Sequence, residues 1–466
     1  GDGAGISRFF RALNEVNYHG KVHATLPFKI IDDVSYLKFG SSFLTKSRTF
    51  EVQSYQFRVK GQSQFNGDPD YLFQEENIWT PETGTGTYVI GNYEPVNNFS
   101  SRQNVYAGFL MNELSVRKAK LVYGVRLEKS QMWYTGQNND GSQIYRDTLT
   151  LNELNLLPSV NLIYHLMADD STSRKMNLRM SYNHTLARPS FKEKSIAQIY
   201  DPITSRTFIG NINLKQTTIT NLDLRYEYFM NRGELISVSV FHKLFNGHIE
   251  LIPFETAPDN LKPRNSGRST LTGIEVDLKK NLGFLSAKLT CLSISANVTL
   301  VQSKMDMTTI VVSNGSSAVE SITEYDSRVM NARSGETIGK FRPMTGQSPY
   351  LLNGGINYER KKSGIVANVS YHVKGKTLSI VGVGLIPDVY TNSFHSLNLK
   401  VSKQFTGAKL SFKATNLLNQ SKSSAYQSYS NETLNQSYFS LLHPGRTFSF
   451  SVTMNLKKRS LEKINP

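Results

Sequence analysis

Apolar and polar side chains alternate one by one along most of this chain, in segments that recur from Val16 to Leu456. The last of these segments reads Thr447-Phe448-Ser449-Phe450-Ser451-Val452-Thr453-Met454-Asn455-Leu456. Because side chains point alternately to the two faces of a β-strand, each segment has one apolar and one polar face. The pattern predicts an all-β fold. It leaves open a soluble sandwich, which buries the apolar faces, and a transmembrane barrel, which presents them to lipid around a wet lumen.

The alternation divides the chain into about fifteen strands, which are longer than the strands of most globular proteins. The predicted spans are 16–29, 35–59, 99–115, 118–135, 153–168, 173–187, 217–230, 234–252, 269–281, 286–305, 347–360, 364–381, 393–404, 408–420 and 445–456. Helical periodicity is sustained nowhere. The chain contains no run of about 18 apolar residues, which excludes a transmembrane helix but leaves a barrel possible, because barrel strands hide their hydrophobicity by alternation.

Short and long connections alternate between the predicted strands. Tight connections are expected at 31–34, 117–118, 169–172, 231–233, 361–364 and 405–408. Long ones are expected at 60–98, 136–152, 188–216, 253–268, 306–346 and 421–444, with a modest one at 382–392. Outer-membrane barrels place tight turns on the periplasmic side and long loops outside. The asymmetry therefore favours a transmembrane antiparallel up-and-down β-barrel.

The number of strands bears on how much of a barrel the chain supplies. With long loops outside, the first and last predicted strands both run inward, so residues 1–15 are expected to be an external loop remnant. Bacterial single-chain barrels have even strand numbers, and an odd number that begins outside predicts a start partway round a larger barrel. Splitting 35–59 near Lys46 would give about sixteen strands, but residues 44–48 have no Gly, Pro, Asn or Asp to form a turn. We expect a partial barrel over 16–456 and a basic tail over 457–466.

The excess of basic residues narrows the range of partners. The chain has 53 Lys and Arg against 37 Asp and Glu, a formal net charge of +16. This excess fits solubility and nonspecific attraction to polyanions, and it equally fits contacts with anionic lipid head groups or a lumen for anionic solutes. The basic residues are scattered rather than clustered on one arm or helix, so nucleic acid is not an expected partner.

Motifs for catalysis are absent from the sequence. It has no P-loop, HExxH or GxSxG motif, and its single cysteine, Cys291, excludes a disulfide framework and a cysteine metal site. His19 and His23 are expected on one inward face, about 13 Å apart along a strand, which is too far to share a metal ion. We therefore expect no enzyme activity, no cofactor and no metal site. Residues 1–5 do not have the charged and apolar regions of a signal peptide.

Several short motifs occur in a recognisable order. Arg188-Pro189-Ser190-Phe191-Lys192-Glu193 follows a predicted strand, and Gly210-Asn211-Ile212-Asn213-Leu214-Lys215 precedes Asn221-Leu222-Asp223-Leu224-Arg225-Tyr226-Glu227-Tyr228-Phe229. Later landmarks are Gly233-Glu234-Leu235-Ile236-Ser237-Val238-Ser239-Val240-Phe241-His242-Lys243, Gly273-Ile274-Glu275-Val276-Asp277, Ala414-Thr415-Asn416-Leu417-Leu418-Asn419 and Pro444-Gly445-Arg446-Thr447-Phe448. In this order the series resembles the TonB-dependent outer-membrane receptors, in the style found in Bacteroidetes. Ile212 and Gln216 stand where that family usually has proline.

The resemblance implies the C-terminal part of a 22-stranded barrel in the bacterial outer membrane. The family's plug domain and TonB box, and roughly its first seven strands, have no counterpart in the sequence, and Leu456 stands where the closing strand usually ends in an aromatic residue. The implied function is ligand-gated import of a bulky solute, such as a siderophore or glycan, with TonB energy. The implied partners are outer-membrane lipid and lipopolysaccharide, the solute, TonB through the missing plug domain, and a surface lipoprotein.

Candidate ligand-binding residues lie in the predicted loops and on the inward faces. Amphipathic rings can stack on sugars or chelates, or can hold loops together, and the candidates are Trp79, Tyr88, Trp133, Tyr134, Tyr426 and Tyr429. Inward arginines can offer planar forks to carboxylates or phosphates, and the candidates are Arg126, Arg179, Arg188 and Arg225. The same arginines are expected to pair with Glu128, Asp223 and Glu227 in the wall.

Three functions remain open on the sequence alone. The first is the barrel portion of a ligand-gated importer. The second is a self-contained porin-like channel or a surface-binding barrel whose loops bind partners. The third is a soluble all-β binding module. Solubility without detergent would reject the first two, and the sequence upstream in the genome would separate them.

Overall fold

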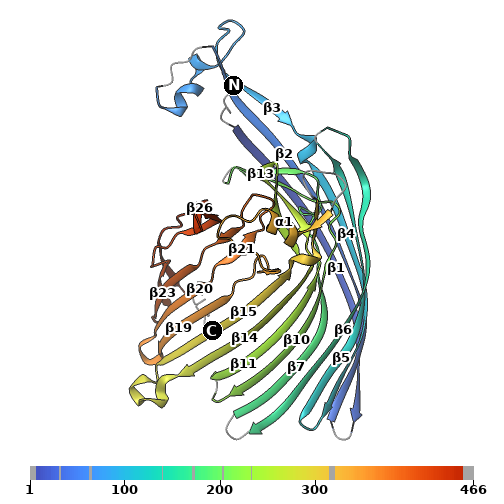
Figure 1. The fold of residues 1–466 in the computed structure, drawn as a ribbon. Helices are drawn as coiled ribbons and strands as arrows, with labels where there is room; N and C mark the ends of the chain where they lie inside the picture. Colours follow the sequence, from blue (N-terminus) through green and yellow to red (C-terminus); the bar gives the residue numbers. More distant parts are fainter. Residues whose placement is uncertain are drawn as a thin grey trace, which may run out of the picture.

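One large antiparallel sheet curves into a wall in the computed structural model, which describes residues 7–30, 33–61, 66–138, 140–169, 174–201, 204–231, 233–313 and 321–454 (Figure 1). Fifteen strands of this sheet follow one another in chain order, each hydrogen-bonded to the next. They are β1 (Ser7–Ile30), β2 (Asp33–Lys60), β4 (Phe99–Val116), β5 (Ala119–Gln137), β6 (Ile144–Asp169), β7 (Arg174–Ala187), β10 (Thr217–Phe229), β11 (Leu235–Asn246), β14 (Arg268–Asn281), β15 (Leu292–Asp306), β19 (Tyr350–Arg360), β20 (Ile365–Lys374), β23 (Phe394–Gln404), β24 (Ala408–Thr415) and β27 (Thr447–Met454).

The shorter elements lie mostly at the end of the wall that carries the long connections. Figure 1 shows α1, β13, β21 and β26 gathered there. These elements are β3 (Gly86–Tyr93), β8 (Gln198–Asp201), β9 (Arg206–Ile209), β12 (Ile249–Phe254), β13 (Ala257–Asn265), β16 (Val311–Ser313), β17 (Ser321–Thr323), α1 (Glu324–Met330), β18 (Phe341–Arg342), β21 (Thr377–Ile380), β22 (Val389–Thr391), β25 (Lys422–Ser430) and β26 (Thr433–Leu442). Single 3-10 turns cover Pro69–Phe73, Glu75–Asn77, Pro95–Asn97, Leu282–Phe284, Ala287–Leu289, Met307–Thr309 and Lys361–Ser363. None of the helices among the described residues is long and apolar enough to cross a membrane.

The predicted strand number and the single long second strand are confirmed, since β2 runs without a turn through Lys46. Two predicted loops are wrong. Residues 7–15, expected as an external loop, belong to β1, because β2 continues alongside them and pairs Ser7 with Gln56. Most of 136–152 forms the ends of β5 and β6, which pair as far as Gln137 and Ile144. The basic tail 457–466 lies outside the described residues.

The two faces of the wall have the polarity that the alternation predicts. On β10 the outer face carries Leu222, which is 53% exposed, and Leu224, while Asp223 and Arg225 occupy the inner face. The register places Leu224 between Met180 of β7 and Val240 of β11, so apolar side chains continue from strand to strand around the outside. An exposed apolar belt of this kind is the surface that a barrel presents to lipid.

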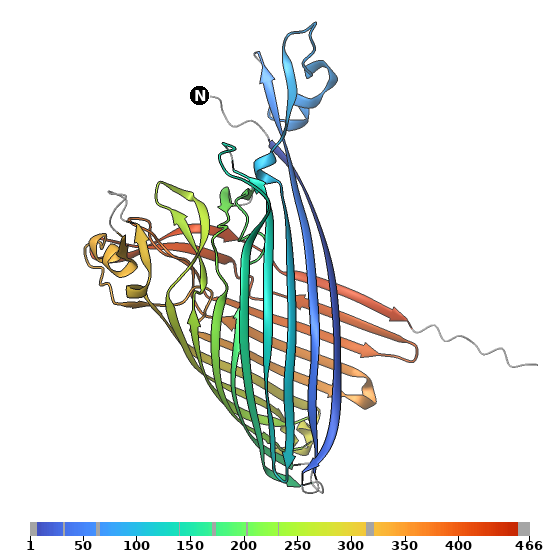
Figure 2. The same cartoon turned by 90° about the vertical axis from the view of Figure 1, so that its right-hand side faces the viewer.

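The wall is open between its first and last strands. Among the described residues no pairing joins β1 to β27, although every other wall strand has a partner on both sides. Figure 2 shows β1 at one edge of the curved sheet and the strands of the C-terminal part at the other. The inner face is therefore reached from the open side.

Candidate functional site

Two glutamates on the inner wall, Glu227 and Glu128, each bind two arginines. Nε of Arg179 lies 2.8 Å from a carboxylate oxygen of Glu227, and Nε of Arg225 lies 3.0 Å from the other oxygen. Arg225 also contacts Asp277 on β14, 3.1 Å away. These contacts form one charge network across β7, β10, β11 and β14, because Ser239 of β11 accepts a further hydrogen bond from Arg225 at 2.8 Å.

A second network surrounds Glu128 on β5. Nη2 of Arg126 lies 2.9 Å from one oxygen of Glu128, and Arg188, which follows β7 directly, contacts the other. The guanidinium of Arg126 also donates to the hydroxyl of Ser42 on β2, at 3.3 Å. Glu128 is buried and its carboxylate has little contact with water, so the two arginines compensate its charge.

The predicted pairing of the four candidate arginines is thus confirmed for Glu128 and Glu227 and wrong for Asp223. Asp223 instead accepts a hydrogen bond from the Ser181 hydroxyl at 3.0 Å, because the neighbouring strand places a serine opposite it. Asp277, which the sequence did not single out, takes its place as a partner of Arg225. The inner wall therefore presents balanced charge rather than bare arginines.

The segment after β7 folds against the upper part of the inner wall. Phe191 and Ala197 of this segment are buried in an apolar cluster with inward side chains of β2, β4, β5 and β6, namely Phe50, Val52, Phe99, Met132, Tyr134 and Leu151. The ring of Phe191 also lies under the guanidinium of Arg48, 5.3 Å away. Apolar residues at inward positions thus mark where a loop covers the wall.

Lys194 holds the same segment through hydrogen bonds to its backbone. Its side chain is 2% exposed, and its Nζ donates to the carbonyl oxygens of Ile212 and Leu214, 2.6 and 2.7 Å away. Burial lowers the pKa of this ammonium to about 8, and the charge of Glu153 opposes that shift. The backbone of the 210–215 motif is therefore held by the lysine that directly follows the motif at 188–193.

Three outer loops meet in a buried charge network. Arg342 (β18) donates to Glu324 (α1) and to Glu250 (β12), with distances of 2.7 Å to each. Arg264 of β13 lies 3.0 Å from Glu250 and also contacts Glu324. Arg328, one helical turn after Glu324, binds that residue at 3.1 Å. We refer to these side chains, together with Asp388, as the loop network.

The charges of the loop network shift the pKa values of its members. Burial alone raises the pKa of Glu324, but the charges of Arg342, Arg264 and Arg328 outweigh burial and lower it to about 2. Arg328 extends the network by binding Asp388, 2.7 Å away between β21 and β22. The pKa of Arg328 is raised because Asp388 and Glu324 outweigh its desolvation. Glu324 and Arg328 are therefore both charged near neutral pH.

A polar cavity of about 230 Å³ adjoins the loop network. Gly382 and residues 384–388 line one side, and residues of α1, the segment after it, β22, β25 and β26 line the rest, among them Arg328, Arg333, Tyr390, Gln427 and Tyr429. Nε2 of Gln427 is buried without a hydrogen-bond partner among the described residues. The cavity thus combines aromatic rings with hydrogen-bond donors, which suits a ligand rich in oxygen acceptors.

The predicted aromatic candidates are scattered over several places. Trp79 and Tyr88 lie together on the projection that continues β2 and β3, with ring centroids 6.3 Å apart. Trp133 and Tyr134 lie on β5, within the predicted strand 118–135, and point to opposite faces, Trp133 against Arg102 outside and Tyr134 into the cluster around Phe191. On β25, Tyr429 lines the cavity.

Tyr426, also on β25, packs its ring against Phe439 at 5.4 Å rather than lining the cavity. Among the described residues, no group of three His, Cys, Asp or Glu side chains is arranged to hold a metal ion. The loop network and Arg333 were missed from the sequence because their partners lie on separate loops. The one available signal was the four-residue spacing of Glu324 and Arg328, which is typical of a helical ion pair.

The family model for the TonB-dependent receptor-like β-barrel matches residues 9–417. This chain belongs to the TonB-dependent receptor β-barrel family. Members of the family are receptors and transporters rather than enzymes, and the family places this barrel in the bacterial outer membrane. The sequence has no significant match among curated proteins.

Solved receptor structures resemble the barrel in fold. The siderophore receptor PiuA from Acinetobacter baumannii is 10% identical, with a TM-score of 0.61, and the match covers 95% of this chain and 56% of PiuA. The ferric-catecholate import receptor Fiu from E. coli K12 is 12% identical, with a TM-score of 0.54 over 95% of this chain and 55% of Fiu. The ferric citrate transporter FecA is 13% identical, with a TM-score of 0.58, and the match covers 97% of this chain and 56% of FecA. The chain therefore spans about half the length of these structures.

Proposed function

We propose that this chain forms the wall and outer loops of a ligand-gated importer that takes up a bulky solute, such as a siderophore or a glycan, with TonB energy. The observation that carries the proposal is the covered outer end of a polar-lined wall in a member of this family. A passive pore needs an unobstructed outer mouth. Here the segment after β7 and the loop network instead occupy the outer end, as expected of a receptor that captures its solute before admitting it.

The partners follow from the same proposal. The solute would meet the outer loops first, and the cavity beside Arg333, Tyr390 and Tyr429 is a polar pocket among them. Coupling to TonB would pass through a plug domain that is not part of residues 1–466. The motif series around 188–228 supports a receptor of the Bacteroidetes type, and a surface lipoprotein is a candidate partner of its loops.

Uptake measurements test this function. Cells that carry the intact protein are supplied with a panel of ferric siderophores and oligosaccharides, and cell-associated solute is measured with and without a protonophore. We expect uptake of one solute class, lost on addition of the protonophore. Tyr429→Ala should weaken uptake, whereas Phe284→Ala, at an exposed turn on the opposite side, should not change it. Uptake graded by solute size and insensitive to the protonophore would contradict the proposal and favour the porin-like alternative.

A further inference from the structure

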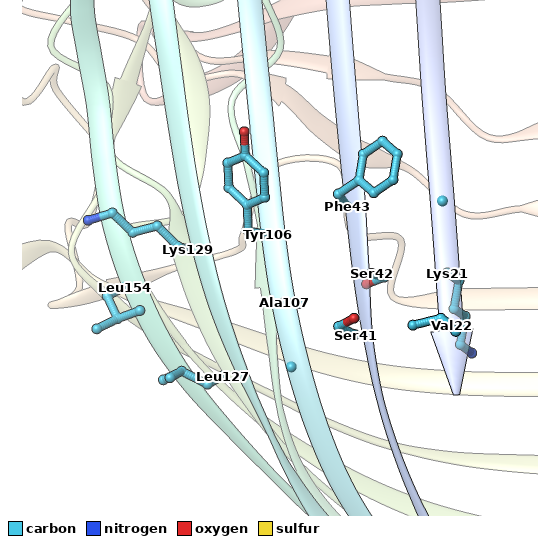
Figure 3. A pocket seen from close by; sticks show the side chains of 12 residues that line it. Lys21, Val22, Ser41, Ser42, Phe43, Tyr106, Ala107, Leu127, Lys129 and Leu154 are labelled. Carbon is cyan, nitrogen blue, oxygen red and sulfur yellow. The ribbon is translucent and has the colours of Figure 1, made fainter. Parts of the chain in front are cut away.

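The outer face of the wall has a hollow of about 620 Å³ that spans β1, β2, β4, β5 and β6 (Figure 3). Its sides are apolar and outward-facing, formed by Val22, Phe43, Tyr106, Leu127 and Leu154. Its floor lies over Ser41 and Gly108, which the register places directly opposite each other on β2 and β4. An indentation in the apolar belt is a surface that lipid, rather than water, would fill.

Two glycines create the hollow. An ideal Cβ on Gly20 would lie only 2.2 Å from the ring of Phe43, so the ring leans over β1 because Gly20 has no side chain. An ideal Cβ on Gly108 would meet nothing closer than 4.0 Å. The ring of Phe43 is thus drawn to one side while the space above Gly108 stays empty. The side chains as they stand give the hollow its shape, so an acyl chain could enter it without any of them moving.

The hollow lies at the border between the apolar belt and the polar outer rim. Going towards the long loops on β5, the outward residues are Leu121, Tyr123, Val125 and Leu127, and then Lys129 and Gln131. Lys129 pairs in register with Tyr106 on one side and Leu154 on the other, so it stands at the rim end of the hollow. This is the depth at which the head groups of the outer leaflet meet their acyl chains.

Lys129 has no acidic partner in the part of the chain that the structure describes. No ion pair or hydrogen bond of its ammonium is found among the described residues, whereas Arg102, two rows further out on the same face, is paired with Asp147 at 3.2 Å. A cation at the membrane interface attracts anionic head groups. Phosphate is the strongest such group that a lipid carries, because its several oxygens accept charge-assisted hydrogen bonds.

We propose that the hollow binds a phosphorylated lipid of the outer leaflet, with one acyl chain over Gly108 and Ser41 and the head-group phosphate against Lys129. Charge complementarity selects this occupant, since a neutral lipid would leave the ammonium unpaired. The site is independent of the transported solute, because it lies on the face opposite the inner wall. Its role is to fix a lipid at the strands that border the open side of the wall.

Native mass spectrometry of the detergent-purified protein tests the site, with lipid A that carries two phosphates and its dephosphorylated counterpart as probes. We expect the wild type to retain the phosphorylated form, and Lys129→Gln to reduce retention about tenfold or more, as expected for loss of a charge-assisted hydrogen bond. Gly108→Leu fills the hollow and should reduce retention of both forms.

Matched variants serve as controls. Lys304→Gln removes an outward lysine from the rim end of β15, and Gly354→Leu fills a second outward glycine position, on β19, where nothing lies within 4 Å of an ideal Cβ. Both controls should retain the lipid as the wild type does. Equal retention of the phosphorylated and dephosphorylated lipids, or unchanged retention by Lys129→Gln, would overturn the proposal. Heat-dependent gel mobility establishes that each variant is folded before it is compared.

Discussion

Glu324 and Arg342 form a buried ion pair among the outer loops, with Nε of Arg342 2.7 Å from a carboxylate oxygen of Glu324 and side chains that are 4% and 5% exposed. The two residues lie 18 positions apart in the same long connection between β15 and β19, and Glu250 and Arg264 join them from the β12–β13 hairpin. A single carboxylate is thus surrounded by three guanidinium groups. Removing it would leave buried positive charge without compensation.

Glu324→Gln is therefore expected to open the outer loops while the wall stays folded. Breaking a buried pair by removing one partner costs about 3–5 kcal/mol, and here the loss falls on the loops that the pair joins. Amide hydrogen exchange of peptides from 249–265 and 321–342 should rise strongly, with β10 and β11 unchanged. Glu432→Gln, at an exposed turn, is the matched control. Unchanged exchange in the loops would show that the network does not hold them together.

The same pair predicts an acid response. The pKa of Glu324 is lowered to about 2 in the folded protein from an ordinary value of 4.5. A carboxyl with a lowered folded pKa contributes stability that is fully present above the ordinary value and is lost as the pH falls through the folded value. Loop protection should hold down to about pH 4.5 and decline towards pH 2. In Glu324→Gln this decline should be absent, and its persistence there would assign the response to other groups.

Phe191→Ala tests whether the segment after β7 is part of the folded wall. The substitution removes a buried ring from the cluster with Phe50, Phe99 and Tyr134, which should cost about 3–5 kcal/mol. Limited proteolysis should then cut within 188–216 at least an order of magnitude faster. Phe284→Ala removes an equal ring that is exposed on the opposite side and should leave cleavage unchanged. Equal resistance of both variants would mean that the segment is held by other contacts.

Lys194 gives the opposite pH dependence from Glu324. Burial lowers its pKa from 10.5 to about 8, so between these values the unfolded segment binds more protons than the folded one. Stability of the segment should therefore rise as the pH is raised from 8 to 10.5, by roughly 3 kcal/mol in total. Amide exchange of 188–216, corrected for its intrinsic rate, measures this. Lys194→Met should abolish the rise, and a rise that persists in the variant would exclude Lys194 as its source.

Leu224→Arg tests the assignment of the outer face to lipid. A cation in the middle of the belt should lower the free energy of unfolding in lipid vesicles by about 2–4 kcal/mol, as measured by urea titration. Asp223→Asn changes the adjacent inward position, whose carboxylate contacts only polar groups, and should have a much smaller effect. Equal effects of the two substitutions would mean that the apolar face is not in contact with hydrocarbon.

The strand pattern was readable because alternation is a local property. Leu222, Asp223 and Leu224 point to alternating faces whatever lies beside them, and the same rule predicts the apolar belt and the polar inner wall. The pairing of Arg126 with Glu128 could also be predicted, because residues two positions apart on one strand point to the same face. The extent of β1 was not, because residues 7–15 alternate poorly and become a strand only by pairing with the extended β2.

The sequence by itself determined the fold class, the two faces and the side that carries the long loops, because each depends on a period of two residues and on the lengths between turns. The tertiary structure alone decided that Glu324 meets Arg342 and Arg264, that Phe191 folds onto the inner wall, and that a hollow opens over Gly108. These contacts join residues from separate strands and loops, and their partners are chosen by register and by burial across the sheet. No local pattern encodes that choice, because water or other neighbours could satisfy the same charges and rings until the sheet and its loops have folded.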